Sequence, residues 1–542
     1  MKKAIFTFSL LAMTVIVMAG GIVTNTNQSA SFIRMPARDA TLGIDAAYYN
    51  PAGMSLLKDG FHLSLNNQYI TQTRTIGSSF RMSNLKEFEG GVTAPIFPSV
   101  YAVYKKNKFA FALALNPIGG GGSAAYENGL PSLENQVAII PASLTAGGVP
   151  TTKYSLDVDF EGKSIIWGVQ GSAAYQANDI VSIAAGLRYV SVSNSYKGYM
   201  KDIKINPNIP AVKAEYNGAN MVKATTFFSD FSAYLLNVSG VLNGTGQGLQ
   251  PIITGGGGAV LLSNGTAAGL TAAQVAQLQA TITALGGNHT TMTIAQSQAF
   301  FFGASATYAT NSTVMAANSQ ATKDMELDAV QKGTGFVPII GVNFQFSDNF
   351  SVAVKYEHRA SMKVKNETTK DDVKMFPDGD ETPNDMPSML AVGTTFAPIS
   401  KIKFHAGIHY YLDKNAEYGK KKGGVFVKNS EVMDGNLWEG AVGLEYQIFD
   451  KLLVSAGYLR TQTGVTTLYQ NDISHSLSTN SVGGGIKYMV TPNIGLNLGA
   501  MNTWYLTDVK INSITVAGTA IHFAETYDRK AMVIAFGVDF SF

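Results

Sequence analysis

The carboxyl-terminal residues of the chain alternate between two kinds of side chain. In "KAMVIAFGVDFSF" every second position is small or polar, and the positions between them are bulky and apolar. The bulky positions are Met532, Ile534, Phe536, Val538, Phe540 and Phe542. A period of two predicts a β-strand. An apolar face opposite a polar face over about ten residues is typical of a transmembrane barrel strand.

The same alternation recurs with charge on one face. In "FSVAVKYEHRASMKV" the residues Lys355, Glu357, Arg359 and Lys363 share one side, and apolar residues such as Val352 share the other. The core of a soluble sandwich cannot hold a charged face, because burying unpaired charge is too costly. A water-filled lumen can hold it.

Short polar turns separate these segments. Six of them, "KKNKF", "QANDIV", "FSDNF", "PISKI", "IFDKL" and "VTPNI", each join two alternating segments. Short turns on one side and long loops on the other are typical of outer-membrane barrels and predict about fourteen strands, an even number. The strands are expected to start near residues 61, 94, 107, 163, 180, 336, 350, 386, 401, 437, 452, 480, 494 and 530.

One connection, residues 196–335, is too long for an ordinary loop. A helix is expected near residues 271–285, because Thr271 and Gln274 form a capping box. Val275, Leu278, Ile282 and Leu285 would share one face of that helix. We expect an extracellular insertion that folds over the mouth of the barrel. The alternative is a loose surface decoration.

Composition supports a membrane protein that is not helical. Of the 542 residues only 14% are charged, against the usual quarter, so much of the surface is expected not to face water. The net charge of +2 argues against a nucleic-acid partner. Without cysteine the chain has no disulfide and no thiolate nucleophile.

The amino terminus has the pattern of a secretory signal peptide. Lys2 and Lys3 precede an apolar run, and small residues follow it, so residues 1–19 are expected to be a signal peptide that is cleaved after Ala19 or Gly20. The alternative is a membrane anchor, which needs about 20 apolar residues. No later segment is apolar for long enough to cross a bilayer as a helix. The fold class predicted is therefore an all-β, antiparallel transmembrane barrel in the bacterial outer membrane.

Candidate chemistry is sparse. His405 and His409 lie in an alternating strand, where four residues span roughly 13 Å, too far for one metal ion. Lumen-facing structural histidines are expected instead. No catalytic arrangement can be recognised, so no enzyme, cofactor or metal is predicted. The lysines of "GKKKGG", Lys420 to Lys422, predict a solvated loop or a contact with lipopolysaccharide phosphates.

The segment "SASFIRMPARDATLGIDAAYYNPAGMSLL" resembles the amino-terminal plug of the FadL/TodX-type outer-membrane transporters of hydrophobic compounds. The resemblance implies a plug, or hatch, at residues 20–60 inside a barrel at residues 61–542. It assigns the hatch and gating role to Asn50, Pro51, Ala52, Gly53, Arg38 and Asp45. Pro51 fixes its own φ and Gly53 allows a close turn, and the two charged residues are expected to pair with a polar lumen. The alternative is an ordinary turn before the first strand.

A second segment also resembles the family. In "KFAFALALNPIGGGGSAAYENG" a regular strand runs into Asn116 and Pro117 and then into Gly119, Gly120, Gly121 and Gly122. The third strand of family members has an inward kink that opens a gap in the wall, and this run lies where that kink is expected. Proline removes a ladder donor and glycine weakens pairing. The alternative is that the glycines begin an extracellular loop.

The resemblance implies passive transport of hydrophobic molecules, with long-chain fatty acids as the substrate class and lateral diffusion through the wall as the route. Lys197 and Arg359 are the cations that position suggests for a carboxylate. The expected partners are a hydrophobic ligand and outer-membrane lipid or lipopolysaccharide, and the chain is expected to be a monomer. The alternatives are a partly plugged porin for polar solutes and a structural or adhesive barrel whose insertion binds a partner.

Overall fold

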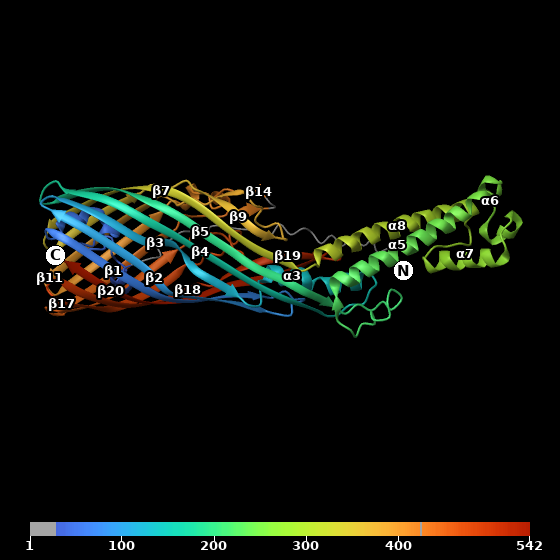
Figure 1. Cartoon of the computed structure of the whole chain (residues 1–542), viewed down its shortest axis with the longest axis horizontal. Coiled ribbons are helices and arrows are strands. Elements are labelled where there is room, and N and C mark those ends of the chain that lie inside the picture. The colour runs from blue at the N-terminus through green and yellow to red at the C-terminus, as the bar shows by residue number, and fades with distance from the viewer. Residues whose placement is uncertain (1–28, 423–424) are drawn as a thin grey trace.

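The computed structural model describes residues 29–422 and 425–542, so the expected signal peptide and residues 20–28 of the expected plug lie outside the described residues. The fold is a closed antiparallel barrel of fourteen strands (Figure 1). The barrel strands are β1 Gly60–Ser78, β2 Glu87–Lys106, β3 Phe109–Tyr126, β4 Tyr154–Gln176, β5 Val181–Ile205, β7 Met325–Ser347, β8 Phe350–Glu357, β11 Met389–Ile399, β12 Ile402–Tyr411, β15 Trp438–Phe449, β16 Leu452–Gln462, β17 Thr479–Thr491, β18 Ile494–Tyr505 and β20 Thr519–Ser541. The ring closes where β1 pairs with β20.

Shorter strands extend the wall at the end of the barrel opposite the six tight turns. They are β6 Val222–Lys223, β9 Lys363–Asp371, β10 Glu381–Pro383 and β19 Asp508–Val516, and β13 Lys421–Lys422 pairs separately with β14 Val425–Phe426. Single helical turns lie in the loops at η4 Asp413–Asn415 and η5 Asn429–Glu431.

The six tight turns are confirmed, and all lie between consecutive barrel strands. The two ends of the barrel chain meet, since the Phe61 N–H donates to the Phe542 carbonyl at 3.2 Å. The strands run farther than expected: β4 and β5 have 23 and 25 residues, whereas a membrane crossing needs about ten. Outside the part of the wall that faces the membrane, both faces of a strand are polar. The alternation of apolar and polar residues that predicts a strand from the sequence is therefore lost there.

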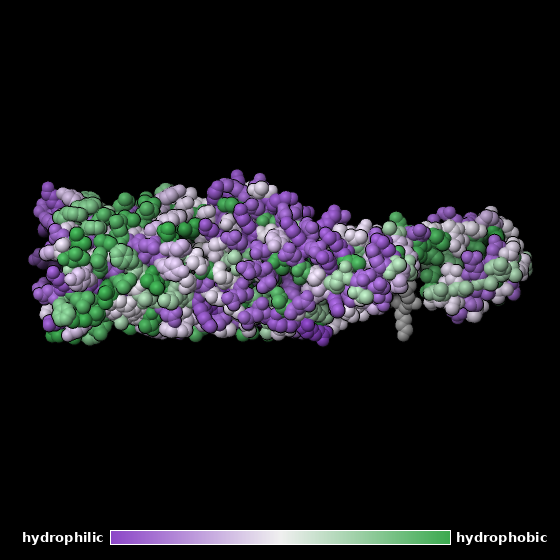
Figure 2. All heavy atoms as spheres, turned by 60° about the horizontal axis from the view of Figure 1, so that its bottom comes forward, coloured by the Kyte–Doolittle hydropathy of each residue, from purple (hydrophilic) through white to green (hydrophobic). Residues whose placement is uncertain are grey.

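An apolar belt surrounds one end of the barrel. Figure 2 shows hydrophobic side chains gathered at the end that holds the carboxyl terminus, with polar side chains over the rest of the wall. Exposed members of this belt are Leu65, Phe111, Leu187, Ile340, Phe404, Leu444, Ile486, Leu498 and Phe536. No helix in the described part of the chain is long and apolar enough to cross a membrane.

The insertion between β5 and β7 differs from the expectation. It spans residues 206–324 rather than 196–335, and its main feature is a hairpin of two long helices, α5 Ala224–Gly248 and α8 Ile294–Ala321. The hairpin projects away from the barrel along its length instead of folding over the mouth (Figure 1). The sequence carried a signal for α5, since Phe228, Phe231, Leu235 and Leu242 recur at helical spacing and are buried. In α8 many of the buried positions are serines, so that helix has a weaker apolar period.

Small elements fill the tip of the hairpin and the barrel mouth. The tip holds α6 Gln250–Thr254, η2 Gly257–Ala259, η3 Leu262–Ala268 and α7 Ala272–Ala284. The expected capping box is present, because the Thr271 hydroxyl accepts from the Gln274 N–H and the Gln274 side chain accepts from the Thr271 N–H. At the mouth, α3 Pro131–Ala138 and α4 Ile140–Ala146 share an apolar core with the base of α5.

Candidate functional site

A plug, residues 29–57, lies inside the lumen. It contains α1 Ala30–Arg34, α2 Ala46–Tyr49 and the short helix η1 Pro51–Leu56, and every residue of the three helices is buried or nearly so. The helices contact opposite parts of the wall: α1 packs against β17, β18 and β20, whereas η1 packs against β4, β5 and β7. The plug therefore crosses the lumen.

Asn50 joins α2 to η1 and ties both to the wall. Its side-chain oxygen accepts from the Gly53 N–H at 3.2 Å, and its amide donates to the Thr41 carbonyl at 3.1 Å and to Oδ1 of Asn343 on β7 at 2.9 Å. Pro51 occupies the first turn of η1, where no N–H donor is needed. A Cβ at Gly53 would lie 2.4 Å from the Asn50 amide, so glycine is required for this close turn. Ala52 is fully buried in the same turn.

Charged residues fix the first half of the plug. Arg38 and Asp45 pair chiefly with each other, with 2.7 Å between Nη2 and Oδ1, and Arg38 approaches Glu445 on the wall only to 3.9 Å. The closer link to the wall is Arg34, whose Nη1 donates to Glu445 at 2.8 Å and to the Ser455 hydroxyl at 2.7 Å. The sequence analysis did not single out Arg34.

The two histidines of β12 are buried and face the plug. His409 lies between two carboxylates, with Nε2 near Asp39 of the plug and Nδ1 3.0 Å from Glu439 on β15. His405 contacts Glu445 at 3.2 Å. Both have lumen-facing structural contacts, and in the described residues no group of three potential ligands could hold a metal ion.

The second half of the plug rests on another buried ion cluster. Arg188 of β5 makes two hydrogen bonds to Glu357 of β8, at 2.7 and 2.8 Å, and its guanidinium carbon lies 4.6 Å from the centre of the Tyr48 ring. Lys355 donates to the Tyr48 carbonyl at 3.0 Å and pairs with Glu357 at 2.9 Å. Lys355 and Glu357 lie on the charged lumen face that the sequence predicts, and there they hold α2 against the wall through the Tyr48 carbonyl.

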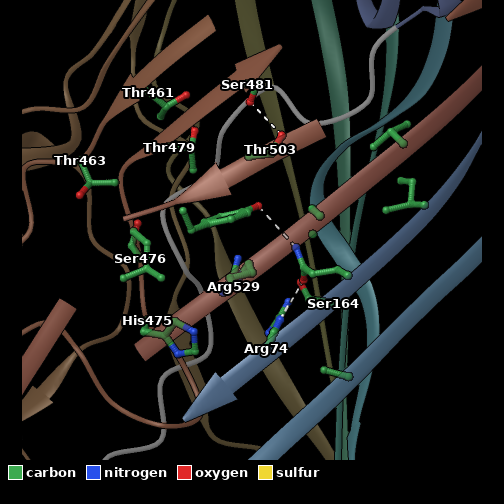
Figure 3. Close-up of a pocket in the computed structure, with 18 of the residues that line it drawn as sticks. Arg74, Ser164, Thr461, Thr463, His475, Ser476, Thr479, Ser481, Thr503 and Arg529 are labelled. Carbon is green, nitrogen blue, oxygen red and sulfur yellow. Dashed lines mark hydrogen bonds between the residues drawn. The ribbon is translucent and has the colours of Figure 1, made fainter. Parts of the chain in front are cut away.

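A cavity of about 390 Å³ lies between the plug and the barrel mouth. At the plug it is lined by the apolar side chains of Phe32, Ile33, Leu459, Met501 and Val533, with the ion cluster of Asp39, His409 and Glu439 beside them. Its other end is polar, and Figure 3 shows Arg74, Arg529 and His475 there together with a group of hydroxyl side chains. The hydroxyl residues are Ser164, Thr461, Thr463, Ser476, Thr479, Ser481 and Thr503. The cavity is therefore amphipathic.

Arg74 and Arg529 are two cationic groups that line this cavity, and Lys163 is a third. The two arginines are direct cross-strand partners on β1 and β20. Arg74 Nε donates to Gln72 at 2.9 Å, and Arg529 stacks 5.1 Å from the centre of the Tyr505 ring. Among the described residues Arg529 Nε has no hydrogen-bond partner. Within the described residues neither arginine forms an ion pair with a carboxylate. Two like charges placed opposite each other destabilise a sheet, so an anion between them would relieve the repulsion.

His475 lies beside this pair, in the loop between β16 and β17. Its side chain is buried, Nδ1 lies 3.3 Å from the Asn471 carbonyl, and Nε2 has no hydrogen-bond partner among the described residues. Burial, and then the positive charges of Arg529 and Arg74, lower the pKa of His475 well below its ordinary value. The imidazole is therefore neutral at pH 7.

The pairing of β2 with β3 lapses beside the cavity, at the Pro/Gly run of β3. Leu115 pairs with Val100 of β2, but the next β2–β3 pair in the described chain is Ala125 with Gly91. On its other side β3 stays paired with β4 through two register shifts, which leave Ile118 and Gly121 as extra residues. Ile118 is buried, and a Cβ on Gly168 would lie 2.8 Å from its side chain.

The cavity reaches this unpaired stretch. Phe97 of β2 and Gly120 and Ala124 of β3 all line it. Gly120 has φ +84°, and a Cβ there would lie 2.3 Å from the Ser164 carbonyl oxygen, so glycine is required. Asn116 is buried and donates to the Pro117 carbonyl at 3.2 Å. Gly119 and Gly122 take part in the pairing with β4.

Lys197 and Arg359, the cations that the sequence suggested for binding a carboxylate, lie outside this cavity. Lys197 is exposed on the upper wall and pairs with Asp328 at 3.3 Å, and Arg359 is partly exposed, 3.7 Å from Asp385. Neither lines the cavity. The sequence analysis missed Arg74 and Arg529, although each falls on the lumen phase of its strand's alternation. The solvated loop expected at "GKKKGG" is wrong for Lys420, which is buried against the ring of Tyr469, with Nζ 3.2 Å from that residue's carbonyl oxygen.

Comparisons with known proteins identify the fold. No family model matches the sequence, and no curated protein matches it either. Among solved structures, a Pseudomonas aeruginosa FadL homologue matches with a TM-score of 0.55 and 12% identity, over 96% of this chain and 100% of that one. A TodX deltaS2S3 mutant, described as a monoaromatic hydrocarbon channel, matches with a TM-score of 0.50 and 13% identity, over 94% of this chain and 98% of that one. The chain has the fold of a FadL-type barrel.

Proposed function

We propose that this protein is a passive outer-membrane channel for hydrophobic molecules, with long-chain fatty acids as the substrate class. The observation that carries the proposal is the amphipathic cavity, which is closed by the plug at one end and meets the unpaired stretch of β2 and β3 at its side. The two structural neighbours support it, since their names describe a FadL homologue and a hydrocarbon channel.

The shape of the cavity suits an acyl chain with a charged head. Arg74 and Arg529 would hold the carboxylate, because charge-assisted hydrogen bonds from arginine match its two oxygens. The tail would lie against Phe32, Ile33 and Met501. A neutral hydrocarbon would leave the arginine pair without a counterion, so the cavity favours an amphiphilic anion.

The exit we propose is lateral. The plug is bound to the wall from both sides of the lumen, whereas the stretch Asn116–Ala124 of β3 has no β2 partner in the described structure. A solute that passes sideways enters lipid without crossing water, and each buried CH₂ contributes about 0.8 kcal/mol to that transfer.

The test is to straighten β3. Deleting Ile118 and Gly121 removes the two extra residues and gives β3 a regular register with β4. Uptake of a labelled long-chain fatty acid by cells should then fall sharply, while the heat-resistant folded band on gels stays. The control deletes Ala219 and Asn220 from an exposed loop. Undiminished uptake by a well-inserted straightened variant contradicts the lateral route, and an ion current of porin size through the unaltered barrel contradicts the proposed function itself.

A further inference from the structure

The helical hairpin has an unusual charge distribution. Residues 231–322 contain no Asp, Glu, Lys or Arg, whereas a typical chain carries such residues at about one position in four. Charge resumes at once below the hairpin, where Lys201 pairs with Glu326 and Lys204 with Asp202. The stretch without charged residues is therefore confined to the part that projects from the barrel (Figure 1).

The two helices of the hairpin are joined by hydrogen bonds along their inner face. The hydroxyls of Ser232 and Ser312 each donate to the other residue's carbonyl, at 2.8 and 2.9 Å, and Ser239 and Ser305 do the same one heptad farther along. The inner face needs no further partner.

In the described part of one chain the outer faces of the hairpin carry exposed apolar side chains. Leu236 is 59% and Val241 63% exposed. Gly240 and Gly303 lie inside the helices with nothing within 4 Å of the position of a Cβ, although an interior glycine costs about 1 kcal/mol relative to alanine. By contrast, Gly246 has a packing reason, since its Cβ would lie 2.7 Å from the Phe302 ring.

We propose that the hairpin docks a second copy of this chain. The uncharged part of α5, residues 231–248, is about 27 Å long, and two adjacent helices are about 19 Å wide. One face of this part therefore offers roughly 500 Å², or roughly 1,000 Å² over two partners, which is at the low end for a specific interface. A charged partner would meet no counter-charge on this surface, but two identical uncharged faces do not repel each other.

Insertion in a membrane favours a second copy of the chain as the partner that docks on the hairpin. Barrels in one membrane point the same way, so their hairpins lie parallel at a high effective concentration. The base of the hairpin is held firmly, because Phe227, Phe228 and Phe231 of α5 are buried in the core at the barrel mouth. Docking therefore joins whole barrels and does not depend on the transport route.

Cysteine cross-linking tests the proposal directly, because the natural chain has no cysteine. Gly240→Cys in intact cells should give an oxidised adduct of twice the chain's mass. Ala214→Cys, in an exposed loop at the barrel rim, should give none. An adduct of any other mass, or equal cross-linking at both positions, overturns the proposal.

A charge variant gives the second measurement. Ala306 is exposed on α8, and Ala306→Glu places like charges in the docked faces, so it should weaken dimerisation of the purified full chain in detergent roughly tenfold or more. Ala214→Glu is the matched control and should leave the dimer unchanged. A sedimentation profile that stays monomeric for the unaltered chain at every concentration overturns the proposal.

Discussion

Arg74 on β1 and Arg529 on β20 are direct cross-strand partners that share one face of the cavity, and no carboxylate in the described residues pairs with either. A fold selected only for stability would avoid two arginines in this arrangement. Replacing one of these arginines is therefore expected to weaken the binding of an anion without lowering the stability of the barrel.

Replacing either arginine tests this. Arg74→Gln or Arg529→Gln should weaken binding of a long-chain fatty acid roughly 10- to 100-fold, because a hydrogen bond to a charged group contributes about 1.5–3 kcal/mol. The same variants should unfold at an unchanged or higher temperature, since the repulsion is relieved. Lys197→Gln, which removes an exposed cation outside the cavity, is the control for binding. Equal binding by all three variants would refute the anion site.

The ion pair between plug and wall is expected to matter for both stability and leak. Arg34 and Glu445 are almost completely buried, and removing one partner of a buried pair typically destabilises by about 3–5 kcal/mol. Glu445→Gln should therefore loosen the plug and raise the conductance noise of single channels. Asp59→Asn breaks the more exposed pair with Lys105 and should leave the conductance unchanged.

The glycines that face the plug should not tolerate a side chain. A Cβ at Gly483 would lie 2.3 Å from the Ile33 carbonyl oxygen, whereas nothing lies within 4 Å of the same position at Gly171. Gly483→Val should displace α1 and lower the unfolding temperature or open a leak. Gly171→Val, in the wall but away from the plug, should do neither. A crystal structure of Gly483→Val with α1 in place would contradict the expectation.

Deleting the plug should open the barrel. A barrel that lacks residues 29–57 should show a large, steady single-channel conductance, because no other segment crosses the lumen at that level in the described structure. Asn50→Ala should act more mildly, since loss of a capping side chain costs about 1 kcal/mol and the plug remains. Equal conductance with and without the plug would show that residues 29–57 do not obstruct the lumen.

The lowered pKa of His475 predicts that the stability of the mouth loop, residues 463–478, depends on pH. The pKa of His475 is lowered in the folded loop, so an opened loop binds a proton more readily than the closed one. The packing of this loop is thus fully stable above the ordinary histidine pKa of about 6.5 and is lost progressively as the pH falls below it. Hydrogen exchange of residues 463–478, corrected for intrinsic rates, should increase from about pH 7.5 to about pH 5.5, and His475→Gln should remove the increase.

The sequence by itself determined the barrel. Strict alternation in the belt, the six short turns and the final strand followed from the requirement that one face meets lipid and the other a polar lumen, and that requirement acts on each strand separately. The resemblance of residues around Asn50 to a known plug pointed to the segment that the structure places in the lumen.

Only the tertiary structure decided which residues meet inside that barrel. Arg74 and Arg529 are far apart in the chain and become neighbours only because β1 pairs with β20 to close the ring. In the hairpin, α8 packs on α5 partly through serine hydroxyls, which produce no apolar period, whereas the apolar period of α5 was present in the sequence and was overlooked. The periodicity of a sequence shows which face of its own strand or helix a residue lies on. A binding site is formed by contacts between different strands, and these contacts depend on the closure of the whole barrel.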